Sequence, residues 1–195
     1  MNDQTPSLAE PIDATPAPVA TTHPSARDYV LAIIIALVGA LFGIVGAFIQ
    51  ELRGGGLFVP FVAGPIIEEA VKPTGVYYLQ ARKPHLLRSQ RFTAMLSGLS
   101  GLVFGLVEST IYVFVYISQP GHGIIIFRYT VDVALHTVCS FIVGLGINQR
   151  LIDSAEGKVP FLDGSRRYYI TAIAIHAVFN ITVTVLSLTD TWNFK

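Results

Sequence analysis

The chain has 195 residues, of which 52% are hydrophobic and 13% are charged, and its formal net charge at neutral pH is zero. This composition is typical of a small integral membrane protein and excludes a basic nucleic-acid-binding domain. Because Cys139 is the only cysteine, an intrachain disulfide and a metal site built on a Cys-x-x-Cys pair are also excluded.

Five hydrophobic stretches, each long enough to cross a bilayer as a helix, follow a polar N-terminal tail. The tail, residues 1–26, is rich in Pro, Ala, Thr and Ser, so we expect it to be disordered. We predict an all-α integral membrane protein with about five transmembrane helices, in which residues 27–195 form one helical domain. The predicted spans are about 29–49, 57–79, 92–118, 124–147 and 168–188.

Lysine and arginine are unevenly distributed over the predicted connections. Five spans place the N-terminus and the connections 80–91 and 148–167 on one face, with nine basic residues against three on the other face. Cytoplasmic loops of membrane proteins are enriched in these residues. The sequence therefore predicts a cytoplasmic N-terminus and an external C-terminus.

The second predicted span carries three charged residues near its middle, Glu68, Glu69 and Lys72, within the sequence GPIIEEAVKP. Each such charge costs about 2.5 to 3.5 kcal/mol at the centre of a membrane. Lys72 lies one helical turn after Glu68 and can neutralise one of the two acids. The remaining negative charge indicates a functional site in the bundle interior, with partners on other helices.

Three other predicted spans carry polar residues that could be these partners. They are Glu108 in the third span, Arg128, Asp132 and His136 at steps of four in the fourth, and His176 and Asn180 on one face of the fifth. Their depths predict that the acids and histidines converge on one buried layer. We also hypothesise that Asp132 orients the imidazole of His136.

This set of side chains permits two kinds of hydrolytic chemistry. A carboxylate can take a proton from water while imidazole or amide groups stabilise the oxyanion that forms on a peptide carbonyl. Alternatively, the same groups can hold a divalent metal such as zinc, which would activate the water. Neither Gly-x-Ser-x-Gly nor His-Glu-x-x-His occurs in the sequence, and Asp132 is the only aspartate inside a predicted span.

Two readings without hydrolysis stay open. Acids and histidines in series also form relays, so the protein could be a non-catalytic proton or cation carrier. It could also be a degenerate scaffold protein of the membrane.

The motifs resemble those of the PrsW family of intramembrane proteases. EEAVK, from Glu68 to Lys72, resembles the family's EExxK motif, and FGLVE, which ends at Glu108, resembles FxxxE. His136 falls where the third motif is expected, and HAVFN, from His176 to Asn180, resembles the last. Asn180 stands where PrsW sequences more often have Asp, and this Asn is shared with the related CPBP superfamily, which includes the CAAX prenyl proteases.

The resemblance implies an endopeptidase, dependent on glutamate or on a metal, in the bacterial cell membrane. Its expected partners are the lipid bilayer and a membrane protein or membrane-anchored peptide as substrate. The favoured water-activating base is Glu68, with Lys72, Arg128 and Asp132 as supporting residues. The other predicted catalytic residues are Glu69, Glu108, His136, His176 and Asn180. The predicted ligands, if a metal is present, are Glu69, Glu108, His136 and His176.

Overall fold

The computed structural model describes residues 24–52, 56, 58–87 and 89–189. Every regular element in these ranges is a helix, and no strand occurs in them, so the predicted all-α class is confirmed. The predicted disorder of the tail concerns mostly residues 1–23, which lie outside the described ranges. Ala26, the last residue of the predicted tail, is already the first residue of a helix.

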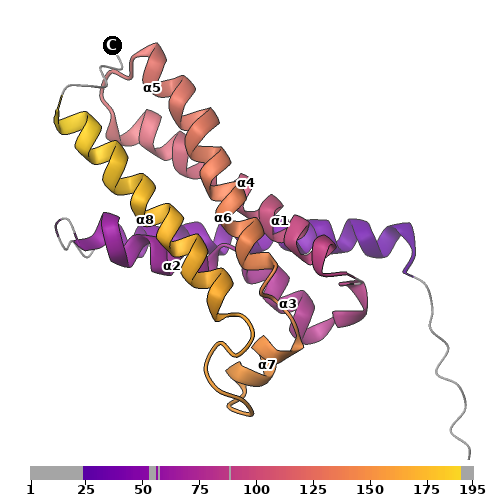
Figure 1. Ribbon diagram of the computed structural model, residues 1–195. Helices are drawn as coiled ribbons and strands as arrows, with labels where there is room; N and C mark the ends of the chain where they lie inside the picture. The colour runs from indigo at the N-terminus through magenta and orange to yellow at the C-terminus, as the bar shows by residue number, and fades with distance from the viewer. Residues whose placement is uncertain (1–23, 53–55, 57, 88, 190–195) are drawn as a thin grey trace, which may run out of the picture.

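The described chain contains long helices joined by shorter ones (Figure 1). The longest elements are α1 (Ala26–Leu52), α4 (Gln90–Ile111), α6 (Val133–Gly144) and α8 (Arg166–Leu188). The shorter α-helices are α2 (Gly64–Val71), α3 (Thr74–Arg82), α5 (His122–Phe127) and α7 (Gln149–Ala155). A 3₁₀ turn, η2 (Pro84–Leu86), follows α3. Three π-helical segments are η1 (Val59–Ala63), η3 (Tyr112–Tyr116) and η4 (Arg128–Asp132).

Four helices in the described ranges are long and apolar enough to cross a membrane. They cover Ala26–Gly46, Gln90–Tyr116, His122–Gly144 and Arg166–Leu188. These correspond to the first, third, fourth and fifth predicted spans.

The second predicted span, 57–79, differs from the prediction because its helix is interrupted. α2 ends at Val71 and α3 begins at Thr74, with Pro73 between them. Proline lacks the backbone N–H that would bond to the carbonyl four residues earlier, and its ring clashes with that carbonyl. The interruption therefore follows directly after Lys72 and divides the segment into two short helices.

Small residues bring the helices around α4 into close contact. A Cβ added to Gly101 of α4 would lie 2.7 Å from Cβ of Ser140 on α6, and one added to Gly144 would lie 2.6 Å from Cα of Ala94. Ser97 donates a hydrogen bond to the carbonyl of Ser140 at 2.6 Å. On the other side of α4, Ser100 donates to the carbonyl of Ala36 in α1 at 2.8 Å. Such contacts are typical of membrane helix interfaces, where small residues allow close backbone approach.

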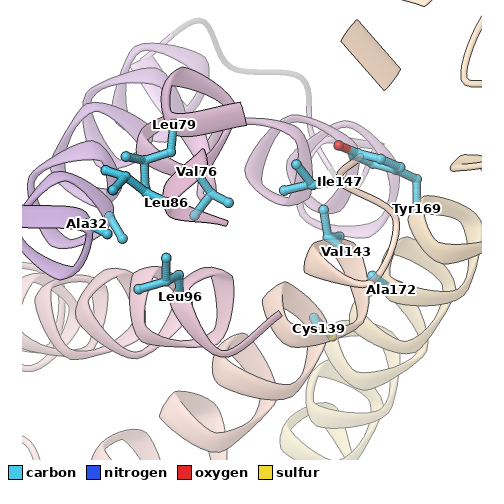
Figure 2. Close-up of a cluster of buried hydrophobic side chains, with 11 residues drawn as sticks. Ala32, Val76, Leu79, Leu86, Leu96, Cys139, Val143, Ile147, Tyr169 and Ala172 are labelled. Atoms are coloured by element: carbon cyan, nitrogen blue, oxygen red, sulfur yellow. The ribbon is translucent and has the colours of Figure 1, made fainter. Parts of the chain in front are cut away.

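The hydrophobic core lies toward one end of the bundle. Figure 2 shows its side chains, which come from α1, α3, η2, α4, α6, the turn after α6 and α8. They include Ala32, Val76, Leu96, Val143 and Ala172. In Figure 1 this is the end at which α3 and α7 lie, whereas the C-terminal end of α8 and the start of α5 lie at the opposite end. The apolar core thus holds the helices together at one end of the bundle. The opposite end lies beyond this core.

Candidate functional site

The site is built around the charged residues of α2. The side chains of Glu69 and Lys72 are fully buried, and that of Glu68 is 12% exposed. Lys72 Nζ lies 2.7 Å from Glu69 Oε1 and 3.3 Å from Glu68 Oε2. The ammonium group therefore contacts both carboxylates, and the helix end at Pro73 places it among residues of α4 and α6.

His136 of α6 lies between this group and Glu108 of α4. Its Nδ1 is 2.6 Å from Lys72 Nζ, and its Nε2 is 2.7 Å from Glu108 Oε2. An ammonium group can only donate hydrogen bonds, so Nδ1 accepts and Nε2 carries the proton that is donated to Glu108. The two contacts fix both the tautomer and the orientation of the ring.

His176 of α8 approaches the acids from the other side. Its Nδ1 lies 2.8 Å from Glu69 Oε1, and a carboxylate accepts, so Nδ1 donates this bond. In the neutral ring the lone pair is then on Nε2, which lies 3.7 Å from Glu68 Oε2. The rings of His136 and His176 are perpendicular, with centroids 5.1 Å apart.

Asp132 pairs with Arg128 and does not hydrogen-bond to His136. Arg128 Nη1 lies 2.7 Å from Asp132 Oδ2, and the guanidinium stacks over the ring of Tyr112 at 3.6 Å. Asp132 Oδ1 is 3.9 Å from His136 Nε2, which is too far for a hydrogen bond. The carboxylate that orients His136 in this geometry is therefore that of Glu108. The structure does not support the hypothesis that Asp132 orients this ring.

A cavity of about 500 Å³ opens beside these groups. Among the described residues, its polar lining is Glu68, Glu108, Tyr112, Arg128, Asp132, His136, His176, Asn180 and Thr184. Its apolar lining includes Val59, Phe127, Phe179 and Val183, and the rings of Phe127 and Phe179 stack with centroids 6.0 Å apart. Glu69 and Lys72 are not part of the lining. The two neighbouring glutamates thus differ, since Glu68 faces the cavity and Glu69 lies behind it.

Asn180 lies one helical turn after His176, on the cavity wall. Its Nδ2 donates a hydrogen bond of 2.8 Å to the carbonyl of Pro60 in η1. A carboxamide nitrogen has two N–H groups, so this bond leaves the second for another acceptor.

The residues fit a divalent metal. Glu68, His136 and His176 each offer a ligand atom, and these atoms lie within 4.8 Å of one another, as do those of Glu108, Asp132 and His136. Glu68 Oε2 is buried and, apart from its ion pair with Lys72 at 3.3 Å, has no hydrogen-bond partner among the described residues. Four carboxylates and two basic side chains meet here, so their formal charges sum to −2, which one divalent cation would balance. They are Glu68, Glu69, Glu108 and Asp132 with Lys72 and Arg128.

These groups contain Glu68 and Asp132, which were not among the ligands predicted from the sequence, and they lack Glu69. Glu69 was among the predicted ligands, but its Oε1 accepts from both Lys72 and His176. Glu68 is the carboxylate that shares a potential metal site with the two imidazoles. A carboxylate behind a histidine ligand, as Glu69 is behind His176, is a common means of orienting the ring toward a metal.

Several cavity residues were not singled out in the sequence. Pro60 and Tyr112 carry no charge and belong to no recognised motif, and Phe179 stands inside HAVFN but is not one of its two polar residues. The described π-helical segments η1, η3 and η4 each contribute residues to the cavity lining. π-helical turns are frequent at functional sites, but the spacing of hydrophobic residues in a sequence does not predict them.

Comparison with known proteins identifies the family. Neither curated proteins nor solved structures gave a match. A family model described as PrsW family intramembrane metalloprotease matches residues 28–192, a range that includes every residue of the site described above. The chain therefore belongs to the PrsW family of intramembrane metalloproteases.

Proposed function

We propose that this protein is a metal-dependent endopeptidase that cuts membrane proteins at a site within the bundle. The observation that carries the proposal is the meeting of Glu68, His136 and His176, from three different helices, at a cavity. Membership of a family of intramembrane metalloproteases supports the same reading.

The metal ligands in this proposal are Glu68, His136 and His176. Nδ1 of His136 and Nε2 of His176 are the ring nitrogens nearest to Glu68 Oε2, at 4.0 and 3.7 Å. The other nitrogen of each ring bonds to a carboxylate, Glu108 for His136 and Glu69 for His176. Zinc suits one carboxylate and two imidazoles, and the chemistry that it supplies is activation of a water molecule at neutral pH.

Glu108 is the residue that we assign to proton transfer. Its carboxylate lines the cavity, accepts from His136 and is 19% exposed, whereas Asp132 is paired with Arg128 and is only 4% exposed. In this role it takes the proton from the attacking water and later delivers it to the leaving amine nitrogen. The assignment moves the role of general base from Glu68, which the sequence favoured, to Glu108.

Asn180 is placed to stabilise the oxyanion that forms on the substrate carbonyl. One N–H of its carboxamide is held by the Pro60 carbonyl, which fixes the plane of the group. The second N–H can then donate to a developing negative charge without reorganisation.

The basic connections suggest on which side the cavity opens. Seven of the described basic residues lie in or next to the connections at the end of the bundle with α3 and α7, and we take this end as cytoplasmic. They are Arg82, Lys83, Arg91, Arg150, Lys158, Arg166 and Arg167. The cavity lining extends the other way, to Gly56, Ile117 and Ile124. We therefore expect cleavage near the external boundary of a membrane-spanning substrate segment.

The test uses the full chain in liposomes with a library of single-span reporter proteins, each tagged at both ends. Reporters that the wild type cuts are then offered to Glu68→Gln and to Glu156→Gln. Glu156 is a matched control because it lies in the connection after α7 and is 51% exposed. We expect Glu68→Gln to lose about 100-fold or more in cleavage rate, and Glu156→Gln to keep the wild-type rate.

Metal removal completes this test. Chelation should abolish cleavage, and added Zn²⁺ should restore it. Cleavage by metal-free protein would contradict the metal site and favour Glu68 as the base. If no reporter is cut but an ion flux across the liposomes depends on Glu68, the carrier reading would replace the protease.

A further inference from the structure

The amino group of Lys72 occupies the centre of the polar layer. It lies 2.7 Å from Glu69 Oε1, 3.3 Å from Glu68 Oε2 and 2.6 Å from His136 Nδ1. The ring of Phe104 lies beneath it, with the centroid 4.6 Å away. The side chain has no exposure, so water does not compete for these contacts.

Two of these contacts involve atoms that a metal would need. Glu68 Oε2 and His136 Nδ1 belong to the Glu68, His136 and His176 group. The imidazole nitrogen Nδ1 has a single lone pair, which cannot accept a hydrogen bond from an ammonium group and bind a metal at once. Nε2 does not offer an alternative, because it donates its proton to Glu108.

We propose that Lys72 is an internal competitor for the metal, a positioning residue that holds His136 and screens Glu68 until a cation displaces it from both. The inference rests on the metal site proposed above. It gives Lys72 a role beyond neutralising the buried acids, because the same contact that orders the metal-free site lowers its apparent affinity for metal.

The surroundings of Lys72 allow this exchange without leaving its charge unpaired. Glu69 does not line the cavity, and its Oε1 already accepts from the ammonium group. Its second oxygen, Oε2, is buried and has no hydrogen-bond partner within the described part of the chain. Lys72 can therefore remain paired with Glu69 when it releases His136, whereas Glu68 and His136 become available on the cavity side.

The first experiment measures Zn²⁺ affinity of purified full-length protein by competition with a chromophoric chelator. The variants are Lys72→Met and, as a matched control, Lys158→Met, whose side chain is 63% exposed in the connection before α8. A hydrogen bond from a charged group is strong enough that its removal should tighten Zn²⁺ binding about tenfold or more. Lys158→Met should bind like the wild type.

The second experiment separates competition for His136 from the simple loss of a positive charge. The gain from Lys72→Met is measured again in a His136→Ala background, where no Nδ1 exists to compete for. We expect a clearly smaller gain in that background. Equal gains in both backgrounds would show that only the charge matters and would overturn the inference.

A further pair guards against misfolding of Lys72→Met, in which buried Glu69 loses its cation. Glu69→Gln removes the matching charge, and its amide oxygen can still accept from His176. Zn²⁺ affinity is therefore also compared between Glu69→Gln and the Glu69→Gln, Lys72→Met double variant, with the same tightening expected. The wild type could bind Zn²⁺ as tightly as Lys72→Met, and Glu69→Gln as tightly as the double variant. That result would overturn the role of Lys72 as a competitor but would leave the metal site itself supported. If no variant binds Zn²⁺, the metal site itself fails, and Lys72 as a competitor fails with it.

Discussion

The two ends of the bundle differ in how their helices are held together. At the end with α3 and α7, apolar side chains from α1, α3, α4, α6 and α8 form a closed core (Figure 2). At the other end, α8 faces α2, η1 and α5 across a cavity of about 500 Å³. There it is held by the Phe127–Phe179 stack and by the bond from Asn180 to Pro60.

The difference shows how a small membrane protein can combine a fixed scaffold with an open site. His136 stands on α6, which is packed tightly against α4, whereas His176 stands on α8, of whose spanning residues only 11% are buried. One wall of the site therefore stands on a closely packed helix. The other stands on a helix at the edge of the bundle, and we expect this wall to yield if a substrate segment enters.

Glu69 is fully buried and lies outside the cavity lining, although its neighbour Glu68 lines the cavity, and its loss should have the largest effect on stability. Glu69→Ala leaves the buried ammonium of Lys72 without its nearest carboxylate and should cost about 3 to 5 kcal/mol of unfolding free energy. Glu68→Ala should cost clearly less, because Glu68 is partly exposed and lies farther from Lys72. Denaturant unfolding in detergent micelles measures both, and equal losses would contradict the distinction between the two acids.

Gly101, at the close contact between α4 and α6, predicts a loss of stability of intermediate size. In Gly101→Ala the new Cβ would overlap the carbonyl of His136 and crowd Ser140, so we expect a loss of about 1 to 3 kcal/mol. Gly46→Ala is the matched control, because the nearest atoms to its Cβ are methyl groups of Val71 at 3.8 Å. Thermal unfolding of the two variants compares them, and similar midpoints would show that the α4–α6 contact is less rigid than proposed.

The sequence predicted much of this arrangement, because burying a charge in a membrane is costly. That cost made Glu68, Glu69 and Lys72 conspicuous, and hydrophobic length located the four long helices. Neither the cost of burial nor hydrophobic length predicted that the helix carrying these three charged residues is interrupted. Pro73 was visible, but a proline inside an apolar run is compatible with a kinked span or with two separate helices.

The partners within the polar layer were harder to predict. A spacing of four residues linked Asp132 to His136 and also Arg128 to Asp132, and only coordinates decide which pair forms. The contact of Lys72 with His136 joins residues 64 positions apart on different helices. The spacing of residues within one helix cannot predict such a contact. Helical geometry therefore gives the face and depth of each group, whereas the pairing depends on how the helices pack.

The aromatic stack offers the smallest predicted change in stability, and it tests the open end directly. Phe179→Ala removes a contact worth about 0.5 to 1.5 kcal/mol beyond the burial of its surface. Because Phe179 is only partly buried and lines the cavity, we expect a stacking contribution near the lower limit and only a small further loss from its buried surface. The expected change is instead in cleavage, since a looser α8 should admit bulkier substrate segments. Cleavage of the reporter library by Phe179→Ala and Phe127→Ala measures this. An unchanged reporter range, combined with a loss of stability as large as that of Gly101→Ala, would mean that α8 is as firmly held at this end as at the core.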